Sequence, residues 1–166
     1  MRILPIILFL LFTAIPVHAS KCEDNFLTAR KYFSKALTLI NNEEYGKAYY
    51  PARSAISYFQ KAERYCDSRN AQSARKQRQS LQEVLPELKV QAEMDTADRF
   101  AAEGYKLQRS KKYAQSAKAF DEAAKHFAKV LEDLDEKETR RRGLMKARMT
   151  NAQLEALKSR KWMEDN

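Results

Sequence analysis

The sequence predicts an all-α fold, built from antiparallel helical hairpins and a long C-terminal helix. Its 166 residues contain only three Gly and four Pro, and three glycines are too few for the hairpin turns of most sheet-rich folds, which need positive φ angles. Apolar residues recur at the three- and four-residue spacing of amphipathic helices. No segment alternates apolar and polar residues as a strand would. The length fits one helical domain over residues 20–166.

The amino terminus resembles a targeting segment. Residues 1–19 combine a positive start with an apolar run and the small residues Val17 and Ala19, which predicts a signal peptide cleaved after Ala19. An uncleaved anchor is the alternative, but the run is shorter than the roughly 20 apolar residues that span a bilayer. A lipid-modified Cys22 is a lesser alternative, because Lys21 stands where a small residue is expected. We therefore expect an exported protein, in the bacterial periplasm or secreted.

A first helical hairpin is expected over residues 29–66. Asp24 or Asn25 can cap its first helix, and a second helix is expected over residues 45–65. Pro51 lies in the second helix and either kinks it or marks its true start, since proline is favoured in a first turn.

The remainder of the chain is also expected to be helical. Residues 67–94 form a polar linking helix that Pro86 kinks or restarts. A second hairpin is expected over residues 97–134, with its first helix starting near Asp95. A basic C-terminal helix is expected over residues 135–162.

Cys22 and Cys66 are the only two cysteines, and an even count in an exported protein indicates a disulfide. Cys22 precedes the first helical pattern and Cys66 follows the second, so a bridge would close the open end of the first hairpin. A bridge enclosing about 45 residues stabilises a fold by about 4 kcal/mol in the chain-entropy model. A redox or metal-binding pair is the alternative, but the spacing has no CxxC character.

The two hairpins match each other in sequence. An offset of 68 positions aligns Ala29 with Ala97 and Tyr45 with Tyr113. This offset is twice 34, the period of the tetratricopeptide repeat. The other aligned pairs are Tyr32 with Phe100, Ala36 with Gly104, Leu39 with Leu107, Ala55 with Ala123, Phe59 with Phe127 and Lys61 with Lys129.

These segments resemble degenerate tetratricopeptide-type hairpins. In the second unit the matching residues are Phe100, Gly104, Leu107, Tyr113, Ser116, Phe120 and Ala123. Small residues at this spacing let paired helices approach, and aromatic residues fill the gaps between hairpins. Lys35, Glu103 and Ala52 depart from the pattern. Any pair of amphipathic hairpins is the plainer interpretation.

The resemblance implies a groove, lined by the first helices, that binds a protein or peptide. In the first unit the groove positions would be Arg30, Phe33, Leu37, Ile40 and Asn41, and in the second Asp98, Ala101, Tyr105, Gln108 and Arg109. We expect partner contacts from Phe33, Tyr105, Gln108 and Arg109. The residues present do not form the family's clamp for a peptide carboxylate, so an apolar groove is expected. The alternative places Phe33 and Leu37 in the core.

Positive charge is concentrated near the C-terminus. The chain has a formal net charge of +9, and residues 140–161 hold eight basic residues and one acid. An envelope-associated protein that binds an anionic surface is therefore the alternative function. The residues expected at that surface are Arg140, Arg141, Arg142, Lys146 and Arg148. A solvated terminal helix is the plainer interpretation. Export argues against nucleic acid as a partner.

Enzymatic activity is not expected. His18 and His126 are the only histidines, and His18 lies in the predicted signal peptide. No recognisable constellation of nucleophile, base or metal ligands is present. We therefore expect no enzyme, cofactor or metal, and an interaction module as the main functional hypothesis.

Overall fold

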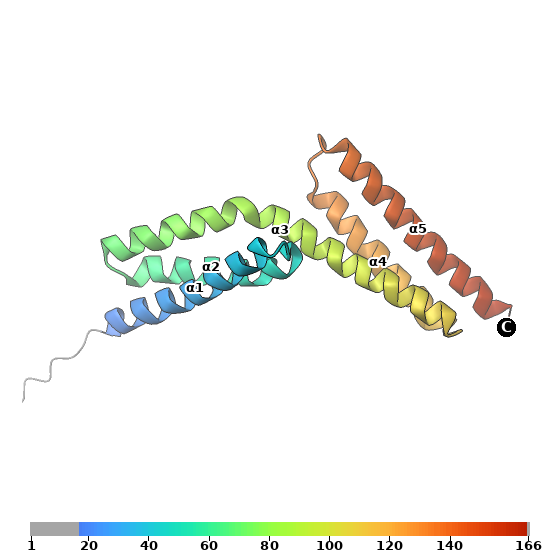
Figure 1. Cartoon of the computed structure of the whole chain (residues 1–166), viewed down its shortest axis with the longest axis horizontal. Coiled ribbons are helices and arrows are strands. Elements are labelled where there is room, and N and C mark those ends of the chain that lie inside the picture. Colours follow the sequence, from blue (N-terminus) through green and yellow to red (C-terminus); the bar gives the residue numbers. More distant parts are fainter. Residues whose placement is uncertain (1–16, 166) are drawn as a thin grey trace, which may run out of the picture.

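A computed structural model describes residues 17–165, and their regular structure consists of five helices (Figure 1). The predicted all-α class is confirmed. The signal peptide predicted over residues 1–19 lies mostly outside the described residues, and its last three residues begin the first helix. The helices are α1 (Val17–Asn41), α2 (Tyr45–Tyr65), α3 (Ser68–Arg109), α4 (Tyr113–Asp133) and α5 (Thr139–Glu164).

The helices form two antiparallel three-helix units that share α3. Among the described residues, every extensive helix–helix contact joins helices that follow each other in the chain. The first half of α3 packs on α2 next to α1, and its second half packs on α4 next to α5 (Figure 1). The two units therefore lie one after the other along a single long helix.

Helix α3 runs without interruption from Ser68 to Arg109. The sequence predicted a linking helix over residues 67–94 and a separate helix starting near Asp95, and this boundary does not exist. Pro86 is exposed, so its missing N–H and its ring affect only the solvent side of the helix. The helix begins where the Asp67 carboxylate accepts a hydrogen bond from the Asn70 backbone N–H at 2.8 Å.

Two apolar stripes on α3 account for its continuity. Ala74, Leu81 and Leu88 are buried in the first core, whereas Val90 and Ala97 belong to the second. Leu88 and Val90 are two positions apart, which places their side chains about 200° apart around a helix. Each unit therefore packs on its own side of α3, and burial in the two cores stabilises both halves of the helix.

The sequence repeat corresponds to repeated geometry. Helices α2 and α4 have 21 residues each and begin at Tyr45 and Tyr113. The preceding turns contain Glu43 at φ 61° and Lys111 at φ 56°. The same backbone bonds close both turns: the Glu44 N–H donates to Leu39 O at 2.8 Å, and the Lys112 N–H donates to Leu107 O at 2.9 Å.

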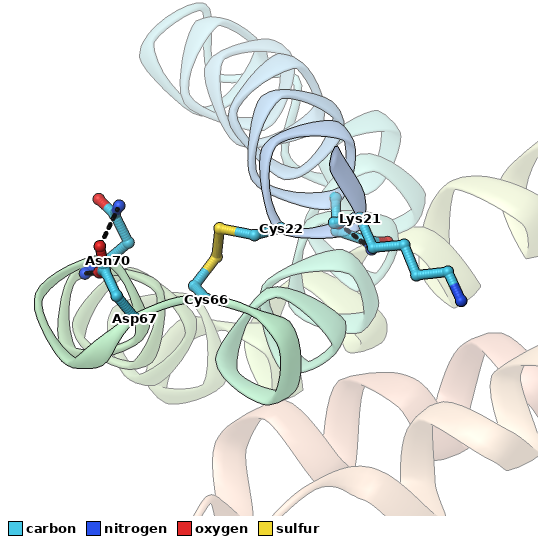
Figure 2. Close-up of a disulfide and its surroundings, with 6 residues drawn as sticks. Lys21, Cys22, Cys66, Asp67 and Asn70 are labelled. Atoms are coloured by element: carbon cyan, nitrogen blue, oxygen red, sulfur yellow. Dashed lines mark hydrogen bonds between the residues drawn. A yellow bond between two sulfur atoms is a disulfide. The ribbon is translucent and has the colours of Figure 1, made fainter. Parts of the chain in front are cut away.

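A disulfide joins Cys22 to Cys66, with the two Cα atoms 4.7 Å apart (Figure 2). It confirms the predicted bridge at the open end of the first hairpin. Cys22 lies inside α1 rather than before it, because the helix begins upstream of the predicted caps. The Asn25 side chain, one of those caps, instead donates to Lys21 O at 2.6 Å.

Replacing both cysteines by serine is expected to lower the free energy of unfolding by about 2–5 kcal/mol, because the unfolded chain regains the entropy of the open loop. Urea denaturation of the oxidised wild type and the C22S/C66S variant measures the difference. Wild type under reducing conditions should match the variant. Equal denaturation midpoints in the oxidised proteins, or two reactive thiols in the wild type, would contradict this prediction.

Candidate functional site: a cavity between α3, α4 and α5

A cavity of about 210 Å³ lies between the last three helices. Three of the groove positions predicted in the second unit line it, namely Asp98, Ala101 and Tyr105. The lining residues from α4 and α5 are Phe120, Phe127, Arg148, Asn151 and Ala152. The predicted groove therefore corresponds here to an apolar cavity that α5 encloses on one side.

The cavity exists because long polar side chains, rather than close packing, connect α5 to α3. Arg148 Nη2 lies 3.2 Å from Asp98 Oδ1, and Asn151 Nδ2 donates to the Tyr105 hydroxyl at 3.3 Å. The small side chain of Ala101 leaves the space between these bridges open. The cavity therefore has an apolar interior and a polar rim.

Aromatic rings line the α4 side of the cavity. Phe120 and Phe127 are buried, and Tyr105 meets Phe120 edge to face with ring centroids 4.9 Å apart. A Cβ atom on Gly104 would lie 2.8 Å from the Phe120 ring. Gly104 thus permits the close approach of α3 and α4 that puts Phe120 beside the cavity.

Gln108, a predicted partner residue, is engaged inside the protein. Its Nε2 donates to Glu155 Oε2 at 3.2 Å and to Ser159 Oγ at 3.0 Å. The buried hydroxyls of Ser159 and Ser116 are 3.1 Å apart, and Ser116 donates to Gly104 O at 2.9 Å. This network joins α3, α4 and α5. The sequence did not predict the role of Ser159, because no sequence pattern distinguishes a serine that bridges helices from any other serine.

The other two predicted partner residues do not line the cavity. Arg109 is exposed, and its Nε donates to Tyr105 O at 3.4 Å. Phe33 packs against the first core, edge to face with Phe59, with ring centroids 5.9 Å apart. The alternative that placed Phe33 in the core instead of the groove is therefore confirmed. Its neighbour Leu37 is 40% exposed rather than in the core. Of the four residues, only Tyr105 is brought to the cavity.

Much of the basic charge of α5 fixes the helix in place. Arg141 pairs with Glu87 at 2.9 Å and with Glu138 at 2.6 Å, and the hydrogen bond to Glu87 raises the pKa of Arg141. Arg142 Nη1 donates to the carbonyls of Leu131 at 2.8 Å and Leu134 at 2.7 Å, which satisfies free acceptors at the end of α4.

The basic residues predicted to bind an anionic surface consequently fall into two groups. Arg141, Arg142 and Arg148 are held by the internal bonds described above, whereas Arg140 and Lys146 are exposed. Of the five residues expected from the sequence, only these two are therefore exposed without an internal bond described above.

His126 lies outside the cavity. Its Nδ1 is 2.5 Å from Glu93 Oε2, and its ring stacks on Phe100 at 5.6 Å between centroids. Over residues 17–165 no group of three or more His, Cys, Asp or Glu side chains is arranged to hold a metal ion. Within that same stretch, none of the helices combines the length and the apolar character needed to cross a membrane.

No protein-family model matches the chain, and no curated protein or solved structure shows significant similarity to it. Function is therefore inferred from the cavity and from the surfaces of the helices.

Glu155 should make stability depend on pH. The hydrogen bond from Lys158, together with the one from Gln108, lowers the pKa of Glu155 from its ordinary value of 4.5, although burial opposes this shift. The ionised Glu155 carboxylate therefore stabilises the fold at pH values above its ordinary pKa of 4.5. This stabilisation is lost as the pH falls through the lowered pKa of the folded protein. Between about pH 6 and pH 3, the wild type should lose more unfolding free energy than Glu155→Gln in urea titrations.

Glu136→Gln, in the exposed turn before α5, is the matched control and should follow the wild type. Parallel pH profiles for the wild type and Glu155→Gln would overturn the assignment of this pH dependence.

Proposed function

We propose that the chain is an exported helical-repeat protein, similar to tetratricopeptide hairpins, that binds a protein or peptide in the periplasm. The observation that carries this proposal is the aromatic-lined cavity between α3, α4 and α5. Three of the ten groove positions that the family resemblance implies, Asp98, Ala101 and Tyr105, line it. The signal-like residues 1–19 and the disulfide support export, because disulfides persist in oxidising compartments.

The size of the cavity favours a peptide side chain as its occupant. Sites for small molecules enclose about 300–1,000 Å³, more than the 210 Å³ found here. Protein partners commonly anchor through one bulky side chain that fills a desolvated pocket. An apolar anchor would lie against Tyr105 and Phe120, beside the rim formed by the Asp98–Arg148 ion pair.

Ala101→Phe is expected to fill the cavity and block the anchor. Peptides would be selected from a displayed random library, and their affinity measured by fluorescence anisotropy with the wild type and the variant. The variant should bind at least about ten-fold more weakly, since one anchor commonly contributes more than about 1.4 kcal/mol. Ala102→Phe, on the exposed neighbouring position of α3, should bind as the wild type does.

Failure to select any peptide with an apolar anchor, or unchanged affinity in Ala101→Phe, would reject the cavity as the binding site. Thermal melts of both variants verify that each protein remains folded.

Export is tested separately. When the full chain is expressed in a bacterium, the protein recovered from the periplasm is expected to begin at Ser20, because cleavage follows Ala19. N-terminal sequencing of the purified fraction measures the cleavage point. Protein that stays in the cytoplasm with Met1 intact would refute the export prediction.

A further inference from the structure

The outer face of α5 carries large apolar side chains in solvent. Leu154 and Leu157 are 51% and 57% exposed. Helix α5 is the last helix of the array and lies at the edge of the molecule, with α4 on its inner side (Figure 1). Ala147, Thr150, Leu154 and Leu157 follow one another at spacings of three, four and three residues. That spacing forms a straight seam in helices that pair with another helix.

The first half of α3 can be compared with α5, because it packs on α2 in the first unit as α5 packs on α4 in the second. The turn before α5 is three residues longer than the turn before α3. The sequence offset that aligns the two units therefore changes from 68 positions for α2 and α4 to 71 positions for α3 and α5. At this offset the buried residues of the two helices coincide: Ala74 with Met145, Leu81 with Ala152 and Leu88 with Ser159.

The outward positions of the two helices differ in chemistry. At the offset of 71, the exposed α3 residues Lys76, Gln79 and Glu83 correspond to Ala147, Thr150 and Leu154 of α5, and the exposed Pro86 corresponds to Leu157. Charged and polar side chains at the first three of these outer positions are therefore sufficient for this helix to fold and pack. The apolar seam on α5 is therefore not required for folding. Single exposed leucines are common on protein surfaces, whereas the seam places apolar side chains at successive positions of one helix face.

The seam is bordered by positive charge. Arg140, Lys146, Lys158 and Lys161 are exposed on α5, and Glu155 is the only acid between Thr139 and Lys161. Glu155 is bonded to Lys158 and Gln108 and is largely buried. A partner with negative charge on both sides of an apolar stripe complements this face, whereas a second copy of α5 would bring like charges together.

We propose that this outer face of α5 docks an acidic amphipathic helix of another protein. The apolar side chains of that helix would lie along Ala147, Thr150, Leu154 and Leu157, and its flanking carboxylates would pair with Lys146, Lys158 and Lys161. This surface is separate from the cavity and does not depend on peptide binding there. It would give the protein a second partner, held by a rigid preformed helix.

The shape of the seam favours a helix over a lipid surface. Helices that lie in a membrane interface have a broad apolar face with bulky side chains such as Trp, Phe and Leu. The first half of the α5 seam instead has small residues, Ala147 and Thr150, and a Cβ atom on the nearby Gly143 would meet nothing within 4 Å. Small side chains let a second helix approach closely.

The test uses the full exported chain and a labelled synthetic helical peptide of about four heptads, with Leu at its core positions and Glu at its flanking positions. A peptide with Lys in place of every Glu is the charge control. Fluorescence anisotropy should show saturable binding of the acidic peptide that weakens with added salt, and at least about ten-fold weaker binding of the basic peptide.

Two variants test the assigned surface. The double variant Leu154→Ser/Leu157→Ser should weaken binding of the acidic peptide at least about ten-fold. Leu27→Ser, on α1 and with the same 57% exposure as Leu157, should leave binding unchanged. A thermal melt confirms that the variants are folded, and the leucines are exposed enough that folding should survive.

Four outcomes overturn the proposal: no binding of the acidic peptide, equal binding of both peptides, equal loss in Leu27→Ser, or self-association of the chain that depends on Leu154 and Leu157. Binding to phosphatidylglycerol vesicles that the double variant abolishes, without binding of the acidic peptide, would assign the face to an anionic membrane instead. The Ala101→Phe variant should bind the acidic helix normally, which separates this surface from the cavity.

Discussion

The continuity of α3 is the constraint on which the rest of the structure depends. Each half of the helix has its own apolar stripe, and the change from Leu88 to Val90 turns the buried face to the other side. Neither unit can bury its core without its half of α3. Because both halves belong to one helix, the positions of α1 and α2 relative to α4 and α5 follow from the rotation between the two stripes.

Close contacts in the second unit come from small residues. Gly104 allows the Phe120 ring to lie against α3, and the hydroxyls of Ser116 and Ser159 replace apolar contacts where three helices meet. Polar groups buried in this way specify one packing arrangement, since a rotated helix would leave them without hydrogen bonds. The distance between α5 and α3, and hence the cavity, is set by this network and by the side chains that bridge the two helices.

Local patterns in the sequence predicted the all-α class, the disulfide and the starts of α2 and α4 at Tyr45 and Tyr113. The continuity of α3 could not be predicted in the same way. Its two stripes face opposite sides, so their periodicities cancel over the whole helix and the exposed Pro86 resembles a boundary. The cavity was predicted only in part. Asp98, Ala101 and Tyr105 occupy the expected face, whereas the direction of Gln108 depends on α5, whose placement follows from a turn three residues longer than its counterpart.

The charge of α5 shows why composition alone does not assign a surface. Four of its five arginines, Arg141, Arg142, Arg148 and Arg160, bond acids or carbonyl groups of other elements, whereas Arg140 is exposed. Its exposed lysines lie outward, where they border the apolar seam. Arginine suits fixed multiple bonding, and lysine suits a flexible charge in water. The same basic helix is therefore anchored by one set of cations while another set remains at the surface.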